Sequence, residues 1–241
     1  MEKLFEELDF RQTPLGDLIL QRRRYLQLDG LDVFEVKLGD AYLMSSLFHV
    51  VEVALANLGL DALGKTTGAD IVCGGLGLGY TAAAALKHPS LKSLIVVDAL
   101  DAVIDWHRRG LVPLGHTLTK DPRCRFVHAD FFNLASNPQH GFDPTSQGRK
   151  FHAILLDIDH SPRNLLAEQN APFYQPKGLA NLAAHLHPGG VFSLWSDDPP
   201  DETFLENLRS AFSHAKAHVV PFSNPLLGKP SASTVYVSVR D

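Results

Sequence analysis

The sequence predicts an α/β fold built on a mostly parallel seven-stranded sheet with an antiparallel edge, preceded by a small N-terminal β hairpin or meander. From Ile71 onward, short apolar runs of strand length alternate with stretches of helical periodicity. The last two apolar runs, 219–222 and 234–239, follow each other with only a loop between them. Alternating strand–helix units favour parallel pairing, whereas two strands joined by a loop favour an antiparallel pair.

Length and composition indicate one compact domain with a substantial core. The chain has 241 residues, of which 45% are hydrophobic and 20% charged, and this composition excludes a wholly disordered protein. Its 22 Lys and Arg residues against 27 Asp and Glu residues give a net charge of −5, whereas a dedicated nucleic-acid-binding protein usually carries a basic excess. We therefore expect no nucleic-acid partner.

The same features favour a soluble cytoplasmic protein. Two cysteines, Cys73 and Cys124, are too few for a disulfide framework and suit a reducing compartment. The acidic N-terminus has no uninterrupted apolar stretch of the kind that a signal peptide needs. The most apolar stretch, residues 43–63, contains polar residues such as Glu52 and Asp61, which make a membrane span and a membrane partner unexpected.

Residues 1–44 are expected to form a β segment that precedes the main domain, residues 45–241. Apolar runs at 15–20 and 31–36 are separated by turn residues, a pattern typical of a hairpin or meander. The main domain then begins with a core-facing helix over 45–60, because apolar residues recur there at helical spacing.

The remaining elements follow in order along the main domain. Strands are expected at residues 71–72, 94–97, 124–127, 151–156 and 191–195, and helices at 81–86, 102–109, 179–186 and 201–212. A stretch rich in Ser, Pro, Gln and Gly, residues 133–150, is expected to be a surface excursion before the fourth strand.

A glycine-rich loop follows the first strand of the main sheet and opens a helix. Its glycines are Gly74, Gly75, Gly77 and Gly79. Glycine permits positive φ and close approach of the backbone to a ligand, and the following helix presents unpaired N–H groups. From Gly75 on, the glycines fall on every second residue, which differs from the dinucleotide-binding pattern and resembles motif I of the class I S-adenosylmethionine-dependent methyltransferase fold. A tight strand–helix turn without a ligand is the alternative interpretation.

Acidic residues follow the second and third strands, at the sheet edge where open α/β sheets bind ligands. Asp98 ends the second strand and can accept hydrogen bonds from both hydroxyls of a ribose. Asp130 follows the third strand and can accept from an adenine amino group, while Phe131 covers the ring. The alternatives are a solvated acid at Asp98 and a helix cap at Asp130.

Asp157, Asp159 and His160 follow the fourth strand and are the predicted catalytic residues. Two carboxylates and an imidazole within four residues form a suitable acid–base set for deprotonating an amine nucleophile. Asp197, after the fifth strand, can add negative charge at the same edge of the sheet. A metal ion is also suited by His152, Asp157, Asp159 and His160, but no H-x-x-x-H or C-x-x-C pattern occurs, so no metal is expected.

The chain resembles the spermidine synthases, the polyamine aminopropyltransferases that use the methyltransferase fold. The similarity covers most of the chain, including the N-terminal β segment and the helix after Asp40. The motifs that carry it are Gly74-Gly75-Leu76-Gly77-Leu78-Gly79, Val97-Asp98, Asp121-Pro122-Arg123, His128-Ala129-Asp130, Leu156-Asp157, Pro172-Phe173-Tyr174 and Leu186-His187-Pro188-Gly189-Gly190-Val191. The N-terminal β segment and the Phe-Tyr pair are more specific to the aminopropyltransferases than the motifs shared with methyltransferases.

The resemblance implies a donor, an acceptor and roles for individual residues. By the resemblance, the donor is decarboxylated S-adenosylmethionine and the acceptor is a polyamine or another small amine, although the missing loop Asp described below also leaves S-adenosylmethionine itself open as the donor. By the resemblance, Asp157 helps to deprotonate the attacking amine, Asp98 holds the ribose and Asp130 holds the adenine. Dimers are usual in the family, so a homodimer is expected by analogy.

Several positions depart from the family pattern, mostly in the acceptor part. The family reads Asp-Ser-Ser/Thr-Asp-Pro where this chain has residues 157–161, so His160 replaces the second acid unless Asp159 takes its place. A Tyr-His/Gln-Glu triplet that helps to hold the polyamine corresponds here to Met44-Ser45-Ser46. The glycine loop lacks the family's Asp, which contacts the amino end of the donor, and residues 222–225 lack the usual tyrosine.

Three functional hypotheses follow from these residues. The first is aminopropyl transfer from a sulfonium nucleoside to an amine. The second is an S-adenosylmethionine-dependent methyltransferase acting on a small molecule, because the acceptor triplet and the loop Asp are missing. The third is a non-catalytic nucleoside-binding protein. The like charges at residues 157–160 argue against it, because they cost stability and a site without catalysis has no need of them.

Overall fold

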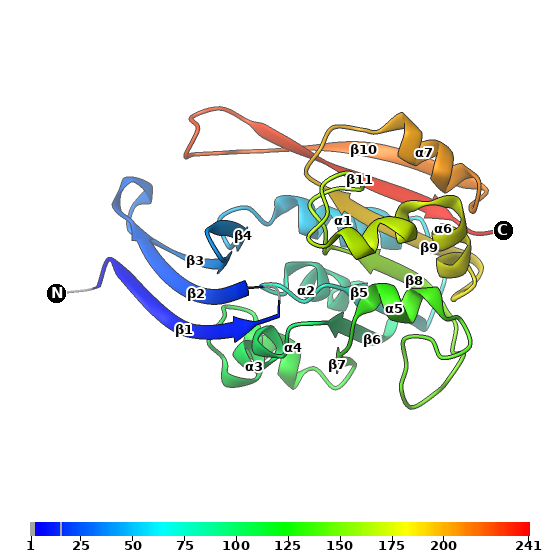
Figure 1. Cartoon of the computed structure of the whole chain (residues 1–241), viewed down its shortest axis with the longest axis horizontal. Helices are drawn as coiled ribbons and strands as arrows, with labels where there is room; N and C mark the ends of the chain where they lie inside the picture. The colour runs from blue at the N-terminus through cyan, green and yellow to red at the C-terminus, as the bar shows by residue number, and fades with distance from the viewer. Residues whose placement is uncertain (1–2, 15) are drawn as a thin grey trace.

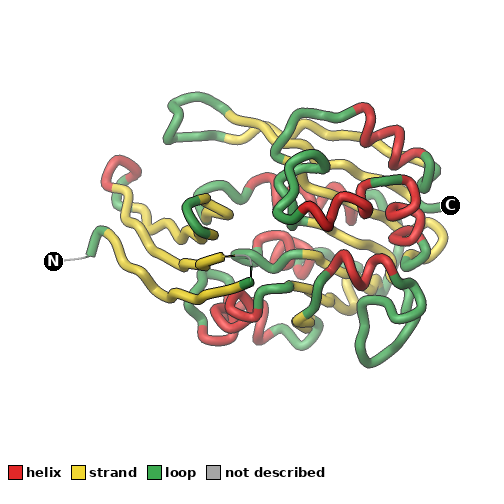
Figure 2. Tube along the Cα trace, in the orientation of Figure 1, coloured by secondary structure: helices red, strands yellow, loops and turns green. Residues whose placement is uncertain are grey.

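The computed structural model describes residues 3–14 and 16–241. Residues 1, 2 and 15, which belong to the predicted segment 1–44, lie outside the described residues. Within the described residues, a four-stranded antiparallel sheet and a seven-stranded mixed sheet form, the second with helices on both faces (Figures 1 and 2). The predicted α/β fold class is thereby confirmed.

The main sheet has the strand order β10-β11-β9-β8-β5-β6-β7. Its strands are β5 (Ala69–Gly74), β6 (Leu91–Asp98), β7 (Cys124–His128), β8 (Phe151–Leu156), β9 (Leu186–Ser196), β10 (His214–Phe222) and β11 (Ser231–Val239). β5 to β9 pair in parallel, whereas β11 is antiparallel to both β9 and β10. The parallel sheet with an antiparallel edge forms as predicted.

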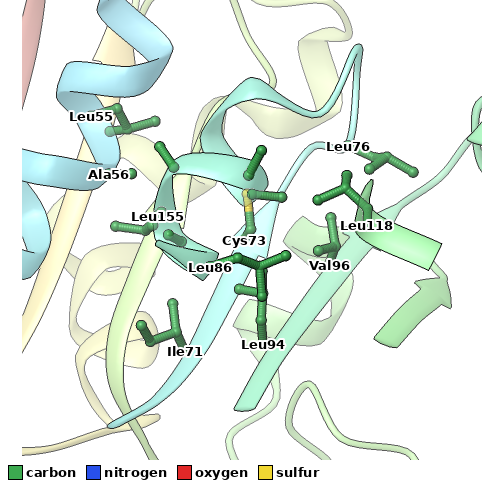
Figure 3. Packing of buried hydrophobic residues seen from close by; sticks show 14 of the residues in the cluster. Leu55, Ala56, Ile71, Cys73, Leu76, Leu86, Leu94, Val96, Leu118 and Leu155 are labelled. Atoms are coloured by element: carbon green, nitrogen blue, oxygen red, sulfur yellow. The ribbon is translucent and has the colours of Figure 1, made fainter. Parts of the chain in front are cut away.

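Helices cover both faces of this sheet because successive strand residues point to opposite sides. The helices are α1 (Val50–Asp61), α2 (Tyr80–Leu86), α3 (Asp101–Arg109), α4 (Gly115–Lys120), α5 (Phe131–Ser136), α6 (Pro176–Ala183) and α7 (Glu202–Arg209), with short 3-10 helices η1 (Leu26–Leu28) and η2 (Glu168–Tyr174). Cys73 of β5 packs in one cluster with Leu55 of α1 (Figure 3), whereas Val72 packs on the other face with Phe131 of α5. Among the described residues, no helix has the length and apolarity needed to cross a bilayer.

The N-terminal sheet is a meander of consecutive antiparallel strands. Its strands are β1 (Phe5–Thr13), β2 (Gly16–Tyr25), β3 (Leu31–Leu38) and β4 (Ala41–Ser45). β1 and β4 lie outside the predicted strands. β1 shows no apolar run, because much of it is exposed and charged. β4 contains the apolar run 41–44, which is short, partly exposed and directly followed by the predicted helix.

This sheet is fixed firmly against the main domain. Asp9 of β1 accepts a hydrogen bond of 2.7 Å from the indole Nε1 of Trp106, a fully buried residue of α3. Leu18, Leu20 and Val36 belong to the same buried cluster as the apolar residues of α1 and β5. The meander therefore shares the main core and holds a rigid wall beside the carboxyl ends of the parallel strands. The division at residues 44 and 45 remains a prediction.

Helix boundaries differ from the prediction at α1, at α6 and at the end of α7, which stops at Arg209 rather than at residue 212. α1 begins at Val50 rather than at residue 45, because Ser45 ends β4 and the Ser46 hydroxyl accepts the N–H of Phe34 at 2.9 Å. α6 begins at Pro176, a residue whose fixed φ suits the first helical position, and ends before Leu186 starts β9. At the start of α1 and at the end of α6, apolar spacing continues past the boundary and hides it.

Residues 133–150 form a surface excursion only in part. α5 extends to Ser136, and further on Phe142 is fully buried. Asp143 is also buried and accepts hydrogen bonds from Arg125 at 2.6 Å and from Arg149 at 2.7 Å. The polar composition describes the exposed part of the stretch, while two anchoring residues tie it to the main domain.

Candidate active site

A cavity of about 740 Å³ lies at the carboxyl ends of the parallel strands. The glycine loop and the residues after β6, β7, β8 and β9 line it. The N-terminal sheet and the β10–β11 hairpin project to the same side of the main domain (Figure 1), and they contribute residues such as Tyr25, Tyr42 and Leu226. The position agrees with the general location of ligand sites in open α/β sheets.

The glycine loop brings its backbone directly beside the end of β8. Gly75 has φ +90°, and a Cβ added there would lie 2.0 Å from the carbonyl oxygen of Asp157. Gly77 and Gly79 also have positive φ and line the cavity with Gly75. Gly74 lies beneath them, where a Cβ would come within 2.5 Å of the Phe131 ring. The predicted loop therefore forms one wall, with Gly74 as a packing residue.

His107 of α3 holds this loop and was missed by sequence reasoning. Its ring is fully buried and its Nε2 lies 2.9 Å from the carbonyl oxygen of Gly77, to which it donates. Burial lowers the pKa of His107 to about 4, so the imidazole is neutral at pH 7. A histidine in a helix pattern carries no sign of such a contact.

Asp98 lies at the end of β6 and lines the cavity, as predicted. Its Oδ2 accepts the N–H of Leu76 at 2.9 Å, and its Oδ1 accepts the N–H of Leu100 at 2.8 Å. Burial raises the pKa of Asp98, and these backbone donors oppose that effect. Each oxygen keeps a second lone pair, so the carboxylate can tie the glycine loop to β6 and still accept from a ligand.

Asp130 and Phe131 both reach the cavity, but their environments differ. Asp130 is exposed and caps α5 by accepting the N–H of Asn133 at 3.1 Å, so the capping alternative is seen as well. Phe131 is 2% exposed and stacks on Phe142 with ring centroids 5.0 Å apart. Phe132, which also lines the cavity, is only partly buried and is better placed than Phe131 to cover a ligand ring.

Asp157 is the predicted catalytic residue that the structure places at the centre of the site. It follows β8, lines the cavity and accepts a hydrogen bond of 3.0 Å from the Thr81 hydroxyl on α2. Burial raises the pKa of Asp157 to about 6, and the hydrogen bond from Thr81 opposes that effect. The carboxyl group is thus mostly ionised at neutral pH and becomes protonated as pH falls through about 6.

Glu52 is a second carboxyl in this site that sequence reasoning missed. It lies on α1 and lines the same cavity. Burial, and then the negative charge of Asp157, raise the pKa of Glu52 to about 8. The two carboxyls therefore hold about one proton between them near pH 7. An acid between the buried Val51 and Leu55 was the available signal, because charged residues rarely sit beside core positions without a role.

The buried carboxyls of Glu52 and Asp157 should make the protein less stable as pH rises. Both raised pKa values mean that the folded state keeps protons that the unfolded chain releases, so stability falls between about pH 5 and pH 8. We expect wild type to lose about 5 kcal/mol of unfolding free energy over this range, and Glu52→Gln to remove most of the loss. Urea unfolding at both pH values measures it, with the exposed Glu206→Gln as control. Equal pH slopes for wild type and Glu52→Gln would contradict the assignment.

His160 lines the cavity, but Asp159 does not. Asp159 is 3% exposed, and its carboxylate accepts from the N–H of Leu166 at 2.7 Å and from the Tyr174 hydroxyl at 2.8 Å. The Asn170 side chain donates to both of its oxygens. The chain leaves the strand conformation after β8, and in this bend Asp159 turns into the protein, where it anchors the segment that leads to η2.

Replacing Asp159 by Ala should therefore reduce stability more than chemistry. The change leaves the buried Asn170 amide and Tyr174 hydroxyl without their acceptor, which costs about 3 kcal/mol. Thermal and urea unfolding measure the loss, and nucleoside binding at a temperature well below unfolding checks the donor site. A variant as stable as wild type but without turnover would restore the predicted catalytic role.

Known proteins similar to this chain belong to one family. A model of the spermine/spermidine synthase domain matches residues 28–236. A polyamine aminopropyltransferase of Pyrobaculum islandicum is 22% identical over 176 residues, which cover 72% of this chain and 57% of the relative. Polyamine aminopropyltransferase 2 of Pseudomonas aeruginosa is 26% identical over 205 residues, covering 81% of this chain and 51% of the relative. The chain thus spans little more than half the length of these curated relatives.

Solved structures share the fold over almost the whole chain. The spermidine synthase of Thermotoga maritima superposes with a TM-score of 0.71 at 15% identity, covering 98% of this chain and 73% of that one. A spermidine synthase in complex with the transition state analogue AdoDATO gives 0.72 at 16% identity, covering 98% and 74%. Since the family model covers most of the sequence, the chain belongs to the spermine/spermidine synthase domain family.

Proposed function

We propose that the cavity binds a sulfonium nucleoside and transfers its aminopropyl group to a small amine. One juxtaposition carries the proposal: the carboxyls of Asp157 and Glu52 lie in the same cavity as the glycine loop of a spermine/spermidine synthase domain. A nucleoside wall beside an acid–base pair is what such a transfer needs. The two curated relatives bear the name polyamine aminopropyltransferase, which supports the same reaction class.

The donor half of the cavity fits a nucleoside. We assign the open backbone of Gly75, Gly77 and Gly79 to the chain attached to the sulfonium. Asp98 is assigned to the ribose hydroxyls, and Asp130 with Phe132 to the adenine. This assignment follows the sequence prediction except at the aromatic residue.

Asp157 is assigned as the base for the acceptor. The amine lone pair attacks the methylene carbon beside the sulfonium, a C–N bond forms, and the C–S bond breaks with its electrons going to sulfur. The nitrogen then gives up a proton, which Asp157 accepts. A pKa of about 6 suits a base that works near neutral pH. The remaining task of the protein is to hold the two reactants in line.

The negative charge of the cavity selects a cationic acceptor. Glu52, Asp157 and the exposed Asp197 line it. Carboxylates in a concave site raise the local concentration of cations, which favours a diamine or polyamine over a neutral nucleophile. We assign His160 as a neighbour that helps to orient Asp157 or the amine, and we leave Asp159 out of the catalytic set.

A methyltransferase is the second candidate, and Gly77 is the observation that favours it. The family's loop Asp is absent, and a Cβ at Gly77 would lie 3.0 Å from the Met44 sulfur, so Met44 occupies space that a side chain would need. The loop therefore offers no carboxylate to the amino end of the donor. A donor that keeps its own carboxylate would meet no charge repulsion at this position.

Calorimetric titration with S-adenosylmethionine, its decarboxylated form and methylthioadenosine tests the proposal. We expect tighter binding of the decarboxylated donor, and release of methylthioadenosine only when putrescine or spermidine is added. Tighter binding of S-adenosylmethionine with methyl transfer would replace the proposal by the second candidate. Absence of binding by all three would leave a protein without transfer activity.

A further inference from the structure

The Thr81 hydroxyl lies between two acceptors at the catalytic end of the cavity. Thr81 is 3% exposed and belongs to the first turn of α2, directly after the glycine loop. Its Oγ1 lies 3.0 Å from Oδ2 of Asp157 and 3.4 Å from the main-chain carbonyl oxygen of Glu52. A hydroxyl has one proton and two lone pairs, so it donates to only one of these oxygens at a time.

We propose that Thr81 is a positioning residue whose hydroxyl rotates to hold Asp157 in both of its protonation states. The inference rests on the proposed function. With Asp157 ionised, the Thr81 O–H donates to Oδ2. Once Asp157 has accepted a proton, its own O–H donates to Thr81 Oγ1, and the Thr81 O–H turns to the carbonyl oxygen of Glu52. Both arrangements leave Asp157 with a hydrogen-bond partner.

This exchange matters because Asp157 is enclosed by protein. An unpartnered polar group in such a place is costly, so a base with a partner in only one state would move or lose driving force when it takes the proton. Threonine rotates about one bond, which needs no movement of the backbone. The base therefore stays in the same position before and after proton transfer.

Several other titratable groups face Asp157 or line the same cavity. The Glu52 carboxyl faces it from α1 and repels its charge. Cys73 faces it from β5, and Tyr80, on α2, lines the same cavity; burial raises the pKa of both. His160 lies in the cavity on the same segment as Asp157. Among the described residues, the side chain that donates a hydrogen bond to Asp157 is that of Thr81.

Thr81→Val and Thr81→Ser form a matched pair for the test. Valine keeps the shape and removes the hydroxyl, whereas serine keeps the hydroxyl. We expect Thr81→Val to lower kcat about tenfold or more and to move the acid limb of kcat/KM up by roughly one pH unit, because the ionised form of Asp157 loses its donor. Thr81→Ser should stay within about threefold of wild type, with unchanged donor affinity in both variants.

A purely structural role for Thr81 predicts a different result. Loss of the α1–α2 contact alone would lower thermal stability while kcat and the pH profile of Thr81→Val stayed as in wild type, and that outcome would overturn the proposal. A loss of kcat without a shift of the acid limb would overturn it as well.

A second readout does not depend on turnover. Aspartate labelled with ¹³C at the side-chain carboxyl reports the titration of Asp157, which Asp157→Asn assigns. We expect Asp157 to titrate at higher pH in Thr81→Val than in wild type and Thr81→Ser. Equal titration in all three would overturn the Thr81 proposal even if wild type transfers aminopropyl groups. If Asp157 titrates at higher pH in Thr81→Val but the wild-type protein transfers no aminopropyl group, the result counts against the proposed function and not against the role of Thr81.

Discussion

Replacing Asp157 by Asn is expected to lower kcat for aminopropyl transfer by roughly 10²-fold or more, the usual scale for losing a general base. The amide cannot accept the proton that leaves the attacking amine. Donor affinity should change little, because the glycine loop and Asp98, which we assign to the donor, line the cavity without using the Asp157 carboxyl. Steady-state release of methylthioadenosine measures the first quantity, and calorimetry measures the second.

The pH profile of the same variant sharpens this expectation. Since burial raises the pKa of Asp157 to about 6, wild-type kcat should fall as pH drops through 6, where the base becomes protonated. Asp157→Asn should lose this limb. The exposed Asp197→Asn is the matched control, and it should raise KM for a polyamine while leaving kcat near wild type. Wild-type turnover by Asp157→Asn with intact donor binding would contradict the assignment.

Replacing Gly75 by Ala is expected to abolish detectable donor binding and to reduce stability by about 3 kcal/mol or more. The new Cβ would lie 2.0 Å from the Asp157 carbonyl oxygen, which belongs to the backbone and cannot rotate away. The φ of +90° adds a cost for any residue with a side chain. Because the contact atom belongs to Asp157, the change displaces the donor loop and the base together.

Gly64→Ala separates the cost of positive φ from the cost of the steric contact. Gly64 also has positive φ, at +63°, but no atom lies within 4 Å of a Cβ added there. We expect it to lose about 1 kcal/mol of stability and to bind the donor as wild type does. Urea unfolding and calorimetry on both variants make the comparison. Normal donor affinity in Gly75→Ala would show that the loop does not form the donor wall.

Much of the fold could be read from local patterns, because strand and helix periods are properties of short segments. The apolar run at 151–156 and the alternation from Ile71 onward predicted the strands of the main sheet in their order along the chain. The residues at which helices begin and end were harder to predict from the sequence. The start of α1 depends on the Ser46 hydroxyl accepting a hydrogen bond from Phe34 on another strand, and no local pattern contains that contact.

The candidate site divides in the same way. Residues at strand ends were found because the carboxyl ends of parallel strands meet at one edge, which brings Asp98, Asp130 and Asp157 to one cavity. Asp159 follows the same strand, yet it turns inward to Asn170 and Tyr174. The chain has left the strand conformation at this point, so no regular alternation along the sequence predicts which of its acids faces the cavity.

The sequence by itself determined the fold class, the family and the edge of the sheet that carries the site, since each depends on order and spacing along the chain. Only the tertiary structure decided which groups surround Asp157. Glu52 and Thr81 lie 105 and 76 positions before it, on two different helices, and packing alone brings them to it. Their effect on the proton affinity of Asp157 depends on distance and burial, which are properties of the folded chain.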